Sequence, residues 1–167
     1  GSAWVGLGNA YGDLHQTDKA INAYQRGLAI NPEYAGTWHN LGTAYITLNQ
    51  TDKAVSAYQR ALAINPELAS AWMGLGNAYH KLNQLDKAVS AYQRALALNP
   101  EHANAWGNLG NAYSDLNQLD KAVSAYQRAL ALNPEHANAW GNLGNAYSDL
   151  NQLDKAVSAY QRALALN

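Results

Sequence analysis

The sequence of 167 residues repeats itself with a period of 34. Tryptophan and proline mark the period most clearly, because each returns at one fixed position: Trp4, Trp38, Trp72, Trp106 and Trp140, and Pro32, Pro66, Pro100 and Pro134. Four complete repeats cover 1–34, 35–68, 69–102 and 103–136, and a shorter fifth covers 137–167. A period of this length is typical of arrays in which each repeat is one supersecondary unit. We therefore predict that residues 1–167 form a single array.

Each repeat carries the apolar spacing of two amphipathic helices. In the fourth repeat a first stripe with helical spacing consists of Trp106, Leu109, Tyr113 and Leu116. A second stripe follows the short polar turn 117–118 and ends before a proline, which the helix cannot continue through. A lone helical hairpin buries too little apolar surface to be stable, so neighbouring hairpins must stack. The pattern predicts an all-α fold of stacked helix-turn-helix hairpins.

These residues resemble the signature of the tetratricopeptide repeat (TPR). In the fourth repeat the matching residues are Trp106, Leu109-Gly110, Ala112-Tyr113, Ala122, Tyr126, Ala129 and Pro134, and the match extends over all five repeats. The resemblance implies a right-handed α-solenoid whose first helices line a concave groove where extended peptides bind. Asn117 and Asn151 stand where the family often has glycine in the inter-helix turn, and asparagine tolerates the same left-handed backbone. A glycine at the register of Gly110 in every repeat predicts a close approach between the two helices there.

The differences between repeats fall almost entirely on the predicted first helices. The third and fourth repeats differ at five positions, and these lie on the side of the helix away from the Trp-Leu-Tyr stripe. The exposed side of the second helix is nearly identical from the second repeat to the fifth. A constant scaffold with one variable face predicts a modular binding surface. Drift of solvent-exposed positions is the alternative.

The variable face is rich in asparagine. A side-chain amide has both donors and an acceptor, so it can match the C=O and N–H groups of an extended backbone without reading side chains. We therefore predict a scaffold that binds extended peptides or unstructured protein segments. The candidate binding residues are Asn9, His39, Asn40, Met73, Asn77, His80, Lys81, Asn104, Asn108, Asn111, Asp115, Asn138, Asn142, Asn145 and Asp149.

The asparagines are similar in register to the ladder on the TPR superhelix of the nucleocytoplasmic O-GlcNAc transferases, which holds peptide backbone. That resemblance applies to Asn40, Asn108 and Asn142, whereas Gly6 and Gly74 leave rungs missing and no catalytic domain is present. The chaperone-binding TPR modules instead hold a C-terminal carboxylate with groove cations. Those cations are missing here, which argues against binding of such acidic tails.

Charge and composition exclude several other functions. The formal net charge is −1, and every Lys and Arg except Lys81 lies in a predicted second helix, so the variable face lacks the cations that neutralise nucleic-acid phosphates. No apolar run approaches the length of a membrane helix. Cysteine is absent, and the five histidines fall in three different regions of the repeat, the groove, a loop and a turn, so we expect no metal, cofactor or enzyme activity. We expect a cytoplasmic protein with no nucleic-acid or membrane partner.

The ends of the array suggest a second function. The fifth repeat ends with the same apolar second helix as the interior repeats, and no polar capping helix follows it. Its Tyr160, Ala163, Leu164 and Leu166, together with the Trp4 side of the first helix, predict end-to-end self-association of a structural module. The segment from Gly107 is also repeated letter for letter from Gly141, by recent duplication or by engineering. The leading Gly1-Ser2 resembles the remnant of a cleaved expression tag.

Overall fold

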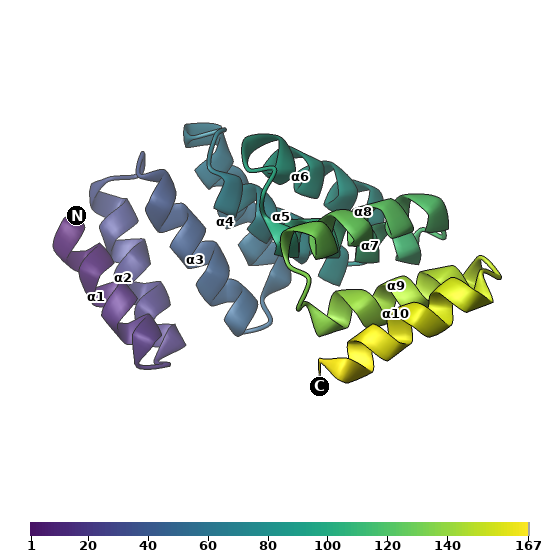
Figure 1. The fold of residues 1–167 in the computed structure, drawn as a ribbon. Coiled ribbons are helices and arrows are strands. Elements are labelled where there is room, and N and C mark those ends of the chain that lie inside the picture. The colour runs from purple at the N-terminus through teal and green to yellow at the C-terminus, as the bar shows by residue number, and fades with distance from the viewer. Residues whose placement is uncertain (167) are drawn as a thin grey trace. The chain divides into compact units, whose positions relative to one another are not determined.

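The computed structural model describes residues 1–166, which form ten helices and no strand (Figure 1). They divide into two compact units, an N-terminal unit of Gly1–Asn83 and a C-terminal unit that begins at Gln84. The helices of the N-terminal unit are α1 Ser2–Asp13, α2 Thr17–Ile30, α3 Ala35–Thr47, α4 Thr51–Ile64 and α5 Ala69–Lys81. Those of the C-terminal unit are α6 Leu85–Leu98, α7 Ala103–Asp115, α8 Leu119–Leu132, α9 Ala137–Asp149 and α10 Leu153–Ala165. The all-α class and the predicted stacking of hairpins are confirmed, while the sense of the superhelical turn stays a prediction.

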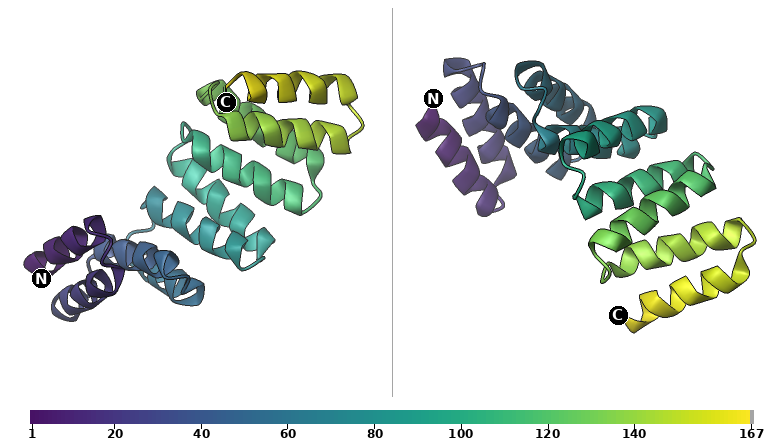
Figure 2. Two further views of the ribbon diagram at one scale, coloured as in Figure 1. Left: turned by 90° about the horizontal axis from the view of Figure 1, so that it is seen from below. Right: turned by 45° about the horizontal axis from the view of Figure 1, so that its top comes forward.

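Helices of one unit stack in a regular order. Within a unit, a second helix lies between the first helix of its own hairpin and the first helix of the next one, as α8 does between α7 and α9 (Figure 2). First helices also contact each other, in the pairs α1 and α3, α3 and α5, and α7 and α9. Among the described residues of each unit, the second helices do not contact one another. Each unit therefore has a closed inner side and an outer side with gaps between successive second helices.

The turn inside each hairpin depends on one residue with left-handed backbone. The backbone angle φ lies between 56° and 59° at Asn49, Asn83, Asn117 and Asn151. His15 has the same conformation in the first repeat, with φ 56°. The peptide N–H of Gln118 then donates to the carbonyl of Tyr113 at 2.8 Å, which closes the end of α7. The prediction that asparagine adopts the left-handed conformation in this turn is confirmed.

The contact predicted at the recurrent glycine is made by a tyrosine ring. A Cβ at Gly110 would lie 2.6 Å from ring carbons of Tyr126, and Gly42 and Gly144 face Tyr58 and Tyr160 in the same way. Glycine is therefore required at this register because the ring of the second helix occupies the space of a side chain. The close approach is confirmed, and the partner is the aromatic ring of the same hairpin.

Neighbouring hairpins are held together by two repeated polar contacts. The indole N–H of Trp140 donates to the carbonyl of Pro134 at 2.8 Å, and Trp38, Trp72 and Trp106 do the same with the proline six residues before them. The side chain of Gln127 donates to the hydroxyl of Tyr147 in the next hairpin at 2.9 Å. The tryptophan and proline of the signature thus form a junction between repeats.

Candidate functional site

The inner side of the C-terminal unit contains a hollow of about 570 Å³, which we call the amide groove. Its lining comes from α7 and α9, from the tyrosines of α8 and α10, and from the loop before α9. Five of the predicted binding residues meet here: Asn108, Asn111, Asn138, Asn142 and Asn145. No Lys, Arg, Asp or Glu lines it, so the groove is neutral.

The other candidate residues lie elsewhere. Asn104, Asp115 and Asp149 are exposed on α7 and α9 but do not line the amide groove. In the N-terminal unit, Asn9, His39 and Asn40 lie on α1 and α3, and Met73, Asn77, His80 and Lys81 lie on α5. His39 is half-buried, with its ring centroid 5.7 Å from that of Tyr58. Peptide binding by these fifteen residues stays a prediction.

Two asparagines of the groove are held by tyrosine hydroxyls. The Oδ1 atom of Asn111 accepts hydrogen bonds from the hydroxyl of Tyr126 at 2.8 Å and from Nδ2 of Asn142 at 2.9 Å. The Oδ1 atom of Asn145 accepts from the hydroxyl of Tyr160 at 2.7 Å. These tyrosines were not among the binding residues predicted from the sequence, although a buried tyrosine hydroxyl normally needs a polar partner and could have pointed to them.

This arrangement changes what the groove offers a ligand. An amide oxygen has two lone pairs, and both lone pairs of Asn111 are engaged by protein donors. Its remaining capacity is the pair of hydrogens on Nδ2, and Asn145 keeps its Nδ2 hydrogens in the same way. We expected each asparagine to present a donor and an acceptor, but at Asn111 the acceptor is already used. The described contacts leave the groove with a surplus of N–H donors.

Two of the tyrosines that donate to asparagine oxygens, Tyr126 and Tyr24, have a raised pKa. Burial raises the pKa of Tyr126, and the nearby carboxylate of Asp115 raises it further, while a hydrogen bond with Ser114 lowers it. Burial and Asp13 also raise the pKa of Tyr24, whose hydroxyl donates to Oδ1 of Asn9 in the N-terminal unit. A hydroxyl whose pKa lies above its usual 10 stays a donor at neutral pH. The hydroxyls of Tyr126 and Tyr24 therefore remain donors to the Oδ1 atoms of Asn111 and Asn9.

Two glycines give the amide groove its floor. A Cβ added at Gly107 or Gly141 would meet no heavy atom within 4 Å, and both residues line the groove. Gly74 in the N-terminal unit is different, because the ring of Tyr58 lies 2.5 Å from its Cβ position. The space left by Gly107 and Gly141 is thus open to a ligand, and the missing rung at Gly74 is filled by the protein itself.

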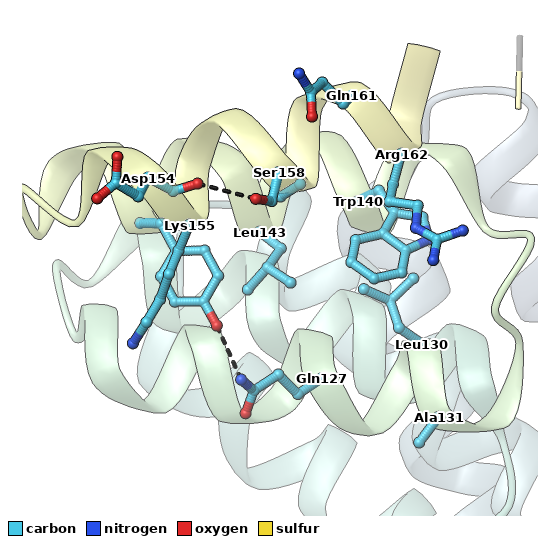
Figure 3. Close-up of a pocket in the computed structure, with 12 residues that line it drawn as sticks. Gln127, Leu130, Ala131, Trp140, Leu143, Asp154, Lys155, Ser158, Gln161 and Arg162 are labelled. Carbon is cyan, nitrogen blue, oxygen red and sulfur yellow. Dashed lines mark hydrogen bonds between the residues drawn. The ribbon is translucent and has the colours of Figure 1, made fainter. Parts of the chain in front are cut away.

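A second kind of groove lies on the outer side. The example in Figure 3 has a volume of about 780 Å³ between α8 and α10, with Trp140 and Leu143 of α9 at its base. Equivalent grooves occur over α7 and over α3. Two polar residues of this groove already contact Tyr147: Gln127 donates to its hydroxyl, and the ammonium of Lys155 lies 5.4 Å from the centroid of its ring. These grooves were not predicted from the sequence, because their residues hardly change between repeats.

We also searched the described residues for a metal site and for a membrane-spanning helix. No set of three or more His, Cys, Asp or Glu side chains in residues 1–166 could hold a metal ion. His102 and His136 act as helix N-caps, since Nδ1 of each accepts from the peptide N–H three residues later at 3.3 Å. Within the same residues, no helix is long and apolar enough to cross a membrane.

Comparison with known proteins identifies the repeat. A family model described as the TPR-containing C-terminal domain of cilia and flagella-associated protein 70 matches residues 1–167. One crystal structure of MamA is 29% identical in sequence, with 96% of this chain and 94% of the MamA chain covered and a TM-score of 0.92. A second MamA structure is 28% identical, with 99% of this chain and 90% of the MamA chain covered and a TM-score of 0.92. YrrB, described as a TPR protein with an unusual peptide-binding site, is 23% identical, with 98% and 84% coverage and a TM-score of 0.86.

No curated protein matches the sequence. The likeness to YrrB shows the fold alone, and the two MamA structures extend over nearly the whole of both chains. The match of the family model to residues 1–167, the hairpins at a 34-residue period and the junctions of tryptophan and proline agree with one another. The chain therefore belongs to the tetratricopeptide repeat family of the CFAP70 C-terminal domain.

Proposed function

We propose that this protein is a protein-interaction scaffold whose amide groove binds an extended peptide segment through its backbone carbonyl oxygens. The observation that carries the proposal is the pair of hydrogen bonds at Oδ1 of Asn111. Because both come from the protein, the Nδ2 hydrogens of Asn111 need an acceptor from elsewhere. A peptide carbonyl is such an acceptor, and every residue of an extended segment carries one.

The spacing of the asparagines fits an extended backbone. Asn138, Asn142 and Asn145 lie at i, i+4 and i+7 on α9, and residues so placed on one helix face have Cβ atoms about 5–6 Å apart. Alternate residues of an extended strand, whose carbonyls point the same way, are about 6.6 Å apart. Flexible amide side chains can bridge the difference, so successive amides can reach alternate carbonyls.

The floor and the charge of the groove favour the same class of ligand. Gly107 and Gly141 leave room for a backbone to approach the helices closely. The neutral lining provides no partner for phosphate or for a cluster of carboxylates. This combination supports recognition of uncharged main chain over recognition of particular side chains. YrrB, which has a similar fold and is described as having a peptide-binding site, supports a peptide as the class of ligand.

The first experiment is selection of an unbiased random peptide library on the parent protein, followed by affinity measurement on Asn145→Asp. This variant keeps an oxygen for the hydroxyl of Tyr160 and removes the Nδ2 donors. We expect its affinity for selected peptides to fall about fivefold to tenfold, the value of one hydrogen bond of about 1–1.4 kcal/mol. Asn104→Asp is the matched control, since it adds the same charge to an exposed position outside the groove.

Backbone analogues of one selected peptide identify the atoms that are read. Replacing an amide by an ester weakens its carbonyl as an acceptor, and N-methylation removes its N–H donor. We expect the ester to weaken binding and N-methylation at the same residue to have less effect. The proposal is wrong if the parent retains no peptide, if both Asp variants lose affinity equally, or if only N-methylation matters.

A further inference from the structure

We infer that the outer grooves of this protein bind small apolar carboxylates. The apolar body of the ligand lies between a tryptophan and a tyrosine of a first helix, and its carboxylate pairs with an arginine of the second helix that follows. The groove over α7 carries the argument, because it lies between α6 and α8 inside the C-terminal unit and has a volume of about 670 Å³. It shares no lining residue with the amide groove, so the inference does not depend on peptide binding.

The lining of this groove is suited to an apolar ligand body. Trp106, Leu109 and Tyr113 of α7 form its floor, and the small side chains of Ala97 and Ala125 line it from α6 and α8. Trp106 and Tyr113 are only partly buried, so the floor keeps aromatic surface in contact with water. Small-molecule sites are concave, mostly apolar and about 300–1,000 Å³ in volume. A ligand of this kind would remove the aromatic surface from water, which favours binding.

One end of the groove carries a cation whose hydrogen-bonding capacity is unused. The guanidinium carbon of Arg128 lies 5.7 Å from the centroid of the Trp106 ring. Within residues 1–166, this guanidinium forms no hydrogen bond or ion pair with another side chain. A guanidinium has five N–H donors in a planar fork that matches a carboxylate. A carboxylate at this end of the groove can therefore accept two hydrogen bonds from Arg128.

The charges of the groove favour an anionic ligand over a cationic one. Protein cations already lie over both aromatic rings, since Nζ of Lys121 is 5.5 Å from the centroid of the Tyr113 ring. Lys121 also donates to Oε1 of Gln118 at 2.9 Å. Its neighbour Asp120 lines the same end of the groove, so the two charges there offset each other. The unbalanced positive charge is at the Arg128 end, which fits a ligand with a single carboxylate.

The polar groups along the floor already have partners within the protein. Nε2 of Gln93 donates to the hydroxyl of Tyr113 at 2.9 Å, and the indole N–H of Trp106 donates to the carbonyl of Pro100 at 2.9 Å. The hydroxyl of Ser124 donates to a main-chain carbonyl of α8 at 3.0 Å. Because these groups are engaged, the floor favours an apolar body over a sugar or a peptide backbone.

The other outer grooves have the same arrangement. In the groove over α3, the guanidinium carbon of Arg60 lies 5.7 Å from the centroid of the Trp38 ring. Figure 3 shows Arg162 beside the Trp140 ring in the groove over α9. The protein therefore presents equivalent sites that each contain their own tryptophan, and binding can be followed separately at each of them.

The test follows the indole N–H signals of ¹⁵N-tryptophan-labelled protein by NMR during titration with naphthalene-2-carboxylate. A two-ring ligand in an open groove is expected to bind with a Kd on the order of 1 mM. We expect the signals of Trp38, Trp106 and Trp140 to shift. Naphthalene-2-methanol has the same rings without the charge, and should give about tenfold smaller shifts at equal concentration below saturation.

Arg128→Gln removes the cation of one groove and leaves the others intact. We expect the carboxylate to bind about tenfold more weakly at Trp106, because the charge-assisted hydrogen bonds are lost. The signals of Trp38 and Trp140 should respond as in the parent protein, and serve as internal controls. The response to the alcohol should be unchanged at every tryptophan, since the alcohol does not use the charge.

A second pair of variants tests the apolar part of the site. Ala97 is exposed on α6 and lines the groove over α7, so Ala97→Met fills that groove without entering the core. It should remove most of the shift at Trp106 for both ligands. Ala131→Met makes the same change in the groove over α9, and should act at Trp140 instead.

Three results would overturn the inference. The first is that no indole signal shifts up to the solubility limit of the carboxylate. The second is that the carboxylate and the alcohol give equal shifts in the parent protein. The third is that Arg128→Gln responds to the carboxylate like the parent at Trp106.

Discussion

The inner faces of the two units use the same scaffold but present different surfaces. In the C-terminal unit, Gly107 and Gly141 leave an open floor beside Asn111 and Asn145. In the N-terminal unit, larger side chains have the register of those glycines: Val5, His39 and Met73. The tyrosine–asparagine contact occurs there at Asn9, but Thr43 replaces asparagine at the next repeat. Two registers of the first helix therefore decide whether a repeat forms an amide groove.

This difference separates residues that support the fold from residues that shape the surface. The contact between a glycine and a tyrosine ring is common to both units, at Gly42 with Tyr58 and at Gly110 with Tyr126. At the register of Gly107, an open glycine occurs in the fourth and fifth repeats, whereas the first three repeats have larger side chains there. Substitutions at the shared register should damage both units, and those at the open register should affect the groove alone.

The largest contrast is expected between two glycines of α7. Gly110→Ala places a Cβ 2.6 Å from the Tyr126 ring and should destabilise the protein by about 2 kcal/mol, since overpacking outweighs the gain in helix propensity. Gly107→Ala meets no atom within 4 Å and should stabilise the protein by about 1 kcal/mol. Urea denaturation followed by circular dichroism measures both changes.

Gly42→Ala should repeat the loss in the N-terminal unit, where the Cβ position lies 2.8 Å from the Tyr58 ring. If Gly107→Ala and Gly110→Ala shift the urea midpoint in the same direction, the assignment of open and filled positions is wrong. Gly107→Ala should also weaken peptide binding, because its methyl group enters the floor of the groove.

A smaller difference is expected between two tyrosines. Tyr126→Phe leaves Oδ1 of Asn111 with one donor and should cost about 1 kcal/mol of unfolding free energy. The Tyr58 hydroxyl contacts the exposed Thr43 at 3.2 Å, so Tyr58→Phe should cost less than about 0.5 kcal/mol. Thermal unfolding of the two variants compares them directly, and an equal loss would show that the asparagine contact adds nothing specific to the C-terminal unit.

The smallest effect is expected at the turn of the first hairpin. His15 has φ 56°, in a turn where the other four repeats have asparagine. Because asparagine adopts this conformation more readily, His15→Asn should stabilise the protein by up to about 0.5 kcal/mol. Asn117→His is the reverse change and should lower stability by a similar amount. Two changes of the same sign in urea denaturation would show that backbone conformation does not control this turn.

Much of the fold follows from the sequence because it is periodic and local. The 34-residue period predicts the hairpins, and the asparagine at each turn predicts the left-handed residue that the structure contains. Stacking follows from the requirement that each hairpin bury its apolar face. These features depend on residues that lie near one another in the chain or recur at one period.

The candidate site was predicted less completely, because its chemistry depends on which side-chain atoms already form hydrogen bonds within the protein. The sequence places Asn111 on the variable face, but the engagement of its oxygen by Tyr126 and Asn142 depends on three helices. Only the stacked structure shows that Gly74 is covered and that Gly107 is open, although both are glycines of first helices. Residue type and register alone do not distinguish these cases.

Four tryptophans, each bonded to the carbonyl of the proline six residues before it, give the protein built-in optical probes. Trp38 and Trp72 report on two junctions of the N-terminal unit, and Trp140 reports on the junction of α8 with α9. Separation of two hairpins exposes the indole ring to water, as at Trp140, which packs against the core that α8 and α9 share, and this exposure shifts the fluorescence emission. Retaining one tryptophan at a time would show where along the chain unfolding begins, which a single global signal averages away.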